Sequence, residues 1–255
     1  MVFSEDLLIG LLRAKRILVF TGAGMSAESG IATFRDVQTG LWARYDAHRL
    51  ASPEGYELDK ALVWGWYEWR RMRVLNAKPN AGHYAIAQLA NYVERLALVT
   101  QNVDDLHERA GSRSVIHLHG SLHHPRCFAC ARPYEFPQGI PNVAAGEGRM
   151  EPPRCSYCNG YIRPGVVWFG EVLPKDAWQQ AEDAALACDV IVVIGTSSLV
   201  WPAAKLPDMA AIRGAKIIQI NPNSTSLDSK ANYNYRGNAG EVLPALVKAL
   251  SDFLG

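Results

Sequence analysis

Two features are missing from this sequence: a long apolar segment and an excess of charge of either sign. No uninterrupted apolar run approaches the roughly 20 residues that a bilayer-spanning helix needs, so no membrane partner is expected. The 26 basic and 25 acidic side chains leave a formal charge of only +1, which argues against nucleic acid as a partner. The remaining composition, 49% hydrophobic and 20% charged in 255 residues, is that of a globular protein with a substantial core.

The features of a secretory signal are also missing from the segment MVFSEDLLIGLLRAKR at the start of the sequence. It has no basic stretch ahead of its apolar residues and no small-residue cleavage site, and Arg13, Lys15 and Arg16 interrupt the apolar pattern. The pattern predicts an amphipathic helix instead. We expect a soluble, cytoplasmic and monomeric protein, without repeats or low-complexity tracts.

Cysteine is scarce, but four of the five cysteines form two CxxC pairs: Cys127 with Cys130, and Cys155 with Cys158. Without an export signal, this spacing favours thiolate ligands over disulfides or free thiols. Four thiolates complete a tetrahedral site and leave no position for water, so we predict one structural Zn²⁺ ion. A zinc ribbon can also bind nucleic acid, but the near-neutral charge weighs against that. The fifth, Cys188, is expected to be a small core residue.

Apolar, β-branched runs alternate with amphipathic stretches along much of the chain. This alternation predicts an α/β fold in which a Rossmann-like parallel sheet has helices on both faces. The runs expected to form strands are Ile17 to Phe20, Leu96 to Val99, Val115 to Leu118, Val166 to Phe169, Val190 to Ile194 and Lys216 to Ile220.

Two stretches interrupt the alternation: residues 36–79, which are aromatic and helix-like, and residues 125–164, which are rich in Cys, Gly and Pro. We predict that these insertions form a smaller domain, helical and zinc-binding. Residues 1–35, 80–124 and 165–255 would then form the sheet domain. A cleft between the two domains would be the natural substrate site.

The most informative segment is TGAGMSAESGIATFR, Thr21 to Arg35, directly after the first predicted strand. Gly22 and Gly24 would let backbone N–H groups approach a pyrophosphate, and Ser26 and Ser29 could add hydroxyl donors. Ordinary tight turns also contain such glycine pairs. Further motifs are therefore needed before the segment predicts a cofactor site.

Three polar segments supply those motifs: TQNVDDLH at 100–107, HLHGSL at 117–122 and GTSSLVWPAA at 195–204, each after an apolar run. Open α/β sheets bind ligands at the carboxyl ends of their strands. Together with the CxxC pairs, and in this order, the segments resemble the sirtuin family from about Leu12 to near the C-terminus. The resemblance implies an NAD-binding sheet domain and NAD-dependent removal of acyl groups from acyl-lysine proteins or peptides, with nicotinamide and O-acyl-ADP-ribose as products.

A histidine is the candidate general base, because an imidazole with a pKa near 6.5 can accept a proton at neutral pH. His117 and His119 lie on the same side of a predicted strand, so their spacing does not choose between them. The sirtuin motif, in which the catalytic histidine directly precedes glycine, selects His119 and implies Asn102 as a second catalytic residue. His123 and His124 are expected at the surface.

Gln101, Asn102 and Asp104 follow a predicted buried strand, where polar groups need partners. Asn102 or Asp104 could equally cap a helix, and Asp105 is expected to act only as a cap. By resemblance, Gln101 and Asn102 contact the nicotinamide ribose and Asp104 the carboxamide. The other cofactor contacts implied by the resemblance are Gly22, Ala23, Gly24, Ser26, Ala27, Phe34, Arg35, His119, Gly195, Thr196, Ser197, Asn221 at the adenosine ribose and Ala239 under the adenine.

The segment RPGVVWFGE at 163–171 resembles the sirtuin strand that pairs with the substrate peptide. Val167, Phe169 and Gly170 would line the acyl-lysine tunnel, and main-chain pairing would give affinity without strict sequence choice. An ordinary core strand is the competing interpretation for Val166 and Trp168.

Tyr67 and Arg70 share one face of a predicted helix because they are three residues apart. A guanidinium can bind a carboxylate with two hydrogen bonds and a phenol can add a third. From spacing alone, an aromatic helix packed on the core with its arginines in solvent is the stronger interpretation, and Arg71 and Arg73 are neighbours that could be confused with Arg70. The YxxR pattern resembles class III sirtuins, which implies a preference for succinyl, malonyl or glutaryl lysine over acetyl lysine.

Two functions of other kinds stay open at this point: a protein ADP-ribosyltransferase that uses the same cleft, and a noncatalytic NAD-responsive scaffold. The sequence also departs from the sirtuin pattern, since Ala32 stands where proline is common and Pro222 and Asn223 follow the asparagine at 221. Neither departure removes a chemical group that the reaction needs.

Overall fold

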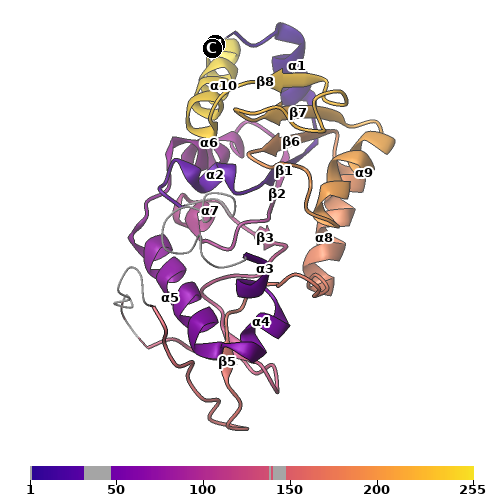
Figure 1. Cartoon of the computed structure of the whole chain (residues 1–255). Helices are drawn as coiled ribbons and strands as arrows, with labels where there is room; N and C mark the ends of the chain where they lie inside the picture. The colour runs from indigo at the N-terminus through magenta and orange to yellow at the C-terminus, as the bar shows by residue number, and fades with distance from the viewer. Residues whose placement is uncertain (1, 32–46, 138, 140–147) are drawn as a thin grey trace.

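A six-stranded parallel sheet is the main element of the computed structural model, which describes residues 2–31, 47–137, 139 and 148–255 (Figure 1). The strand order is β3, β2, β1, β6, β7, β8. The strands are β1 (Arg16–Thr21), β2 (Arg95–Thr100), β3 (Val115–His117), β6 (Val190–Ile194), β7 (Lys216–Ile220) and β8 (Tyr233–Tyr235). The register places Thr21 beside both Thr100 and Ile194, so β1, β2 and β6 end at the same edge of the sheet.

Helices cover both faces of this sheet, which explains why β6 is buried at every residue. One face packs against α1, α6 and α10, and the other against α8 and α9 (Figure 1). The helices are α1 (Glu5–Arg13), α2 (Gly24–Ala27), α3 (Ala47–Leu50), α4 (Pro53–Leu58), α5 (Lys60–Asn76), α6 (Ala81–Leu89), α7 (Leu106–Arg109), α8 (Lys175–Ala187), the 3-10 helix η3 (Ala203–Lys205), α9 (Leu206–Ile212) and α10 (Ala239–Leu254). The predicted fold class is confirmed.

The amphipathic helix predicted near the start of the chain is present as α1. Ser4 caps it by accepting a hydrogen bond from the N–H of Leu7, and Leu7, Leu8 and Leu11 are buried against the sheet. Across the ranges that the structure describes, every helix is too short or too polar to cross a bilayer.

A second group of elements lies beyond one end of the sheet and comes from the two predicted insertions (Figure 1). It contains α3, α4, α5 and a two-stranded antiparallel ribbon, β4 (Arg126–Cys127) and β5 (Ile162–Arg163). Arg149 binds both carboxylate oxygens of Asp59, the residue that caps α5, and a Cβ on Gly65 would lie 1.3 Å from the Gly148 carbonyl oxygen. The two insertions are therefore packed against each other, while their exact domain boundaries stay a prediction.

One expected strand of the sheet was wrong, and one observed strand was missed. Val166 to Phe169 is not a strand of the sheet, because Val166 forms one antiparallel bridge with Gly120 and the N–H of Phe169 binds the Ala51 carbonyl. The apolar run instead fills the core of the smaller group of elements, where Trp168 is 2% exposed. In contrast, β8 was missed, because a Tyr-Asn-Tyr strand offers no apolar run.

Candidate functional site

The loops after β1 and β6 touch each other through glycine. Gly22 donates its N–H to Ile194 and Gly24 donates its N–H to Gly195. A Cβ on either glycine would lie less than 3 Å from backbone atoms of Gly195 or Thr196. These glycines therefore permit a close approach between two loops, and their N–H groups are not available to a pyrophosphate as the sequence suggested. Ala23, between them, is exposed.

Three polar side chains from the segments after β1 and β2 form a buried network. The Asn102 amide donates to the Ser26 hydroxyl at 3.0 Å, and Ser26 donates to Asp104 at 2.9 Å. Burial raises the pKa of Asp104 above its ordinary value. The other carboxylate oxygen of Asp104 caps α7 through the N–H of Leu106, so Asp104 does what was expected of Asp105, whose side chain makes no cap hydrogen bond.

A second set of polar groups links the loops after β2, β6 and β7. The Gln101 amide donates to the Thr196 hydroxyl at 3.0 Å, and the Asn221 amide donates to the Thr196 carbonyl at 2.8 Å. The hydroxyl of Ser198 is buried and has no partner among the described residues. An unpaired buried hydroxyl at this edge of the sheet indicates a position for a polar ligand or water.

His119 lies beside this network with one ring nitrogen engaged. Its Nδ1 is 2.9 Å from the Gln101 carbonyl oxygen, which can only accept, so the hydrogen is on Nδ1. Nε2 has no partner in the described ranges and is left as the basic nitrogen. Burial lowers the pKa of His119 below its ordinary value, against the hydrogen bond to Gln101, so the ring is neutral near pH 7.

The remaining predicted cofactor residues differ in their exposure, and two of them cannot be compared. Phe34 and Arg35, like Ala32, lie outside the described residues. Ala27 is exposed at the end of α2. Ser197 is partly exposed, and Ala239 is only 4% exposed at the first residue of α10, where it leaves little surface for an adenine.

Two anchors of the loop after β1 were missed in the sequence. The Asn80 amide donates to the Met25 carbonyl at 2.9 Å and to the Ser29 hydroxyl at 3.1 Å, while its oxygen caps α6. Glu28 accepts a hydrogen bond from the N–H of Gly240 at the start of α10. Asn80 before an apolar run predicts a helix cap, but no sequence signal gives its contact with residues more than 50 positions away.

Replacing Asn80 tests this anchor. Asn80→Ala is expected to lower the free energy of unfolding by about 1–3 kcal/mol, because both the cap and two donated hydrogen bonds are lost. Asn80→Asp keeps the acceptor for the N–H of Gly82 and removes only the donors, so about 1 kcal/mol of that loss should remain. Urea denaturation of the two variants checks this, and equal losses would contradict an anchoring function of the amide group.

Tyr67 and Arg70 lie together on α5, as predicted. The indole N–H of Trp168 donates to the Tyr67 hydroxyl at 3.0 Å, which leaves the phenolic hydrogen free to donate elsewhere. Burial raises the pKa of Tyr67 to about 12. The Arg70 guanidinium lies 4.9 Å from the ring centre of Trp66 and has no hydrogen bond or ion pair with any described residue.

Arg71, the next residue, shows how a buried arginine is usually paired. Arg71 is buried and forms an ion pair with Glu68 at 2.8 Å, so the alternative of arginines in solvent does not hold for this residue. Arg73 is exposed, as expected. Arg70 therefore differs from Arg71 in being partly buried without a carboxylate, and burial lowers its pKa.

The segment at 163–171, which was predicted to pair with a peptide, is hydrogen-bonded both to the backbone of His119 and to Ala51 of the smaller group of elements. Val167 donates its N–H to the His119 carbonyl at 2.8 Å, which brings it next to the candidate base. Phe169 is 38% exposed, and Gly170 has a positive φ of 85°. Both residues line a cavity of about 400 Å³ together with Arg49, Glu54 and Leu58.

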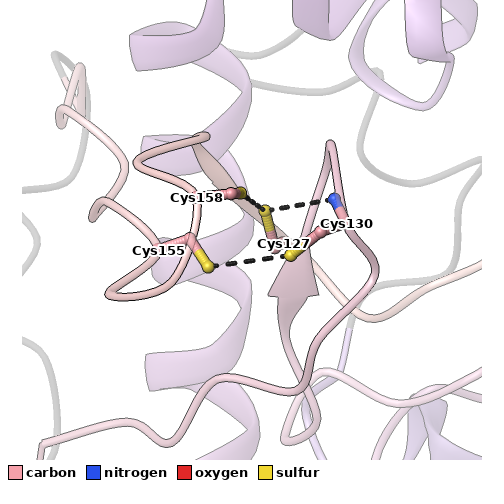
Figure 2. A group of neighbouring side chains, drawn as sticks. All are labelled: Cys127, Cys130, Cys155 and Cys158. Atoms are coloured by element: carbon pink, nitrogen blue, oxygen red, sulfur yellow. Dashed lines mark hydrogen bonds between the residues drawn. The ribbon is translucent and has the colours of Figure 1, made fainter.

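The four cysteines of the CxxC pairs converge on one point (Figure 2). Their sulfur atoms all lie within 4.8 Å of one another, with 3.5 Å between Cys127 and Cys158 and 3.8 Å between Cys130 and Cys155. Tetrahedral zinc with bonds of about 2.3 Å requires sulfur separations of about 3.8 Å. Backbone hydrogen bonds from Cys158 and Tyr157 lower the pKa of Cys155, which favours a thiolate. The set fits one Zn²⁺ ion, with no position left for a reacting water.

Known proteins match this chain along nearly its whole length. Residues 22–202 match the model of the Sir2 family. The chain belongs to the Sir2 family. An NAD-dependent protein deacylase of Methylococcus capsulatus is 62% identical over 250 residues, 98% of each chain, and NAD-dependent protein deacylase 1 of Pseudomonas aeruginosa is 54% identical over 240 residues, 93% of this chain and 95% of that protein.

Solved structures of the Sir2 family agree with the fold. A mutant Sir2 homologue in complex with ADP ribose has a TM-score of 0.90 and 46% identity, covering 99% of this chain and 98% of that one. A Sir2 homologue in complex with NAD has a TM-score of 0.88 and 46% identity, covering 100% and 96%. The family predicted from the sequence is confirmed, and the parts assigned to single site residues stay predictions.

Proposed function

We propose that this Sir2 family chain is an NAD-dependent protein-lysine deacylase that removes acidic acyl groups, succinyl, malonyl or glutaryl, and also acetyl groups. The enzyme class agrees with the names of the relatives in Methylococcus and Pseudomonas. Neighbours solved with NAD and with ADP ribose support NAD as the cofactor. A Sir2 structure with a p53 peptide and NAD⁺, 30% identical to this chain, supports a peptide substrate.

The residues at the carboxyl edge of the sheet fit NAD chemically. Asn102, Ser26 and Asp104 would face its nicotinamide end, and the unpaired Ser198 hydroxyl together with Thr196 would meet oxygens of its phosphates or riboses. When bound, NAD would supply a ribose carbon with nicotinamide as its leaving group and a hydroxyl that takes the acyl group. O-acyl-ADP-ribose would be the second product.

The chain itself would supply proton transfer and orientation. His119, neutral and with Nε2 unpaired, can accept a proton from a ribose hydroxyl. Its Nδ1–H bond to the Gln101 carbonyl fixes both the tautomer and the ring direction, and this bond also stabilises the cation after proton uptake. Val167, hydrogen-bonded to the His119 backbone, would place the acyl-lysine beside that nitrogen.

The preference for acidic acyl groups depends on one observation, the unpaired cation at Arg70. Partly buried charges are normally paired, as Arg71 is with Glu68. An acyl carboxylate would pair the Arg70 guanidinium bidentately and accept the free phenolic hydrogen of Tyr67. Burial lowers the pKa of Arg70, and Tyr67 and Asp104 only partly oppose that shift, so an acyl carboxylate would supply the missing counter-charge.

Arg70→Met tests the acyl preference. With a succinyl peptide, kcat/KM is expected to fall by about 10- to 100-fold, the value of a charged hydrogen-bonded pair of about 1.5–3 kcal/mol. With the matched acetyl peptide, kcat/KM should change by no more than about threefold, because no anion is left unpaired. Mass spectrometry of both peptides with NAD measures the two rates, and equal losses would exclude the carboxylate pocket.

The control is Arg73→Met, which removes an exposed cation from the same helix together with one exposed hydrogen bond, to the Gly30 carbonyl at 3.3 Å, and should leave both rates within about twofold. The same assay separates the rival functions. Nicotinamide release with a labelled protein acceptor would indicate an ADP-ribosyltransferase. NAD binding without release of nicotinamide from NAD in the presence of any acyl peptide would indicate a scaffold.

A further inference from the structure

His117 is held at both ring nitrogens by oxygen atoms of its neighbours. Its Nδ1 lies 3.1 Å from the backbone carbonyl oxygen of Asn102, and its Nε2 lies 2.6 Å from Oε1 of Glu108. His117 ends the edge strand β3 and Glu108 belongs to α7, so the imidazole joins the two elements. The side chain of His117 is 19% exposed, which shields the pair in part from water.

These two partners decide the protonation state of the ring. A backbone carbonyl oxygen only accepts hydrogen bonds, and so does an ionised carboxylate. An imidazole that donates to both must carry a hydrogen on each nitrogen and is therefore a cation. The alternative, a neutral His117 with a protonated Glu108, would place the proton on the weaker base, since the ordinary pKa values are about 4.3 and about 6.5.

His119, two residues along, makes the same kind of contact on one side only. The two histidines bind consecutive backbone carbonyls, His119 that of Gln101 and His117 that of Asn102. Only His117 has a second acceptor. Hydrogen bonding therefore separates two histidines that the strand period leaves equivalent: one is fixed as a cation, and the other keeps a free basic nitrogen.

We propose that His117 is a positioning residue: paired with Glu108 as an imidazolium, it fixes the Asn102 backbone and with it the side chains that would face the nicotinamide end of NAD. Asn102 donates to Ser26 and Ser26 to Asp104, so a shift at Asn102 would reach all three side chains. The inference rests on the proposed function only in taking NAD as the ligand.

The positioning should depend on pH in one direction. Burial alone would lower the pKa of His117, but the Glu108 carboxylate, the Asn102 carbonyl and Asp104 together raise it above its ordinary value. The ion pair with Glu108 is present at neutral pH and is lost as the pH rises through that raised pKa, and the neutral ring then holds the Asn102 carbonyl through Nδ1–H alone, without its anchor on α7. The other titratable groups around the ring or along the same cavity of about 530 Å³ are Asp104, Asp105, His107, His123 and His124.

Nuclear magnetic resonance of the full chain with ¹⁵N-labelled histidine tests the protonation state directly. We expect one histidine with hydrogens on both ring nitrogens at neutral pH, and a titration midpoint that Glu108→Gln lowers by about one pH unit, or tenfold in proton affinity. The shifted resonance identifies His117. Asp105→Asn is the matched control. It removes a carboxylate that lines the same cavity but pairs with His123 instead of His117, so it should not move the His117 midpoint.

Calorimetric titration with NAD, without any acyl peptide, tests the positioning. Binding to the unmodified chain should weaken about three- to tenfold as the pH rises through the His117 midpoint, and Glu108→Gln should show the same loss about one pH unit earlier. His117→Gln keeps a donor for the Asn102 carbonyl without a titrating group, so its weaker binding should be independent of pH in this range.

Two results would overturn the proposal: a neutral His117 at neutral pH, or a shifted midpoint in Glu108→Gln with NAD binding that does not follow it. Both readouts are independent of deacylation. If no acyl peptide is turned over, the proposed function fails while these measurements still decide the state and effect of His117.

Discussion

The variant His119→Ala is expected to reduce deacylation turnover by about 10²- to 10⁴-fold, the usual contribution of a general base, while NAD still binds. The reason is the hydrogen-bond pattern, since Nδ1 is committed to the Gln101 carbonyl and Nε2 is the basic nitrogen. The measurement is kcat with a saturating succinyl peptide, beside NAD affinity by calorimetry. Full activity in this variant would exclude His119 as the base.

The control for this variant is His124→Ala, which removes an exposed imidazole five positions along the chain and should leave kcat within about twofold. The pH dependence gives a second check. Because burial lowers the pKa of His119, the base is available at neutral pH and is lost only as the pH falls through that lowered pKa. An activity loss on the acid side above the ordinary histidine pKa would contradict the assignment.

Long apolar runs made the sheet predictable. The bounds of β1, β2, β3, β6 and β7 agree with the predicted apolar runs to within one residue, because strands buried on both faces need continuous apolar side chains. The run at Val166 has the same composition but packs among aromatic residues of the smaller group of elements, and composition does not distinguish those two cores.

The positions of the site loops were predictable, but their internal contacts were not. Polar segments after strands predict a site because parallel strands end at one edge of the sheet. That Gly22 and Gly24 serve to bring two loops together depends on Gly195 and Thr196, more than 170 positions later. Contacts of this kind leave no local pattern in the sequence.

The charge state of individual side chains was the property that the sequence predicted least well. The sequence places Arg70 and Arg71 side by side, and only the structure pairs one with Glu68 and leaves the other without a carboxylate among the described residues. Likewise His117 and His119 share one face of the predicted strand, and the hydrogen bond to Glu108 distinguishes His117 from His119. The proposed functions of Arg70, His117 and His119 all depend on which hydrogen-bond or ion-pair partners each side chain has.

The packing between the two insertions connects the metal site to helix α5. Trp64 of α5 packs against Cys127 and Cys155, and Gly65 of the same helix touches the Gly148 carbonyl. The helix that carries Tyr67 and Arg70 is therefore supported by the cysteine segment, although the sulfur atoms take no part in the chemistry.

Cys155→Ser is accordingly expected to remove zinc and, with it, most deacylation. Zinc sites of this kind contribute about 10–16 kcal/mol to folding, so one thiolate of four accounts for on the order of 3 kcal/mol, or a more than 100-fold loss of zinc affinity. Release of the metal should loosen α5 and reduce turnover of succinyl peptides at least tenfold. Elemental analysis should find one zinc per unmodified chain and much less than one in the variant.

NAD binding shows whether loss of the ion affects the smaller group of elements alone. The sheet and its loops have their own core, so Cys155→Ser should bind NAD within about threefold of the unmodified chain while its acyl pocket is lost. Cys188→Ala, which removes a buried cysteine outside the cluster, should keep its zinc and its turnover. Normal turnover by a zinc-free Cys155→Ser chain would show that α5 does not depend on the metal site.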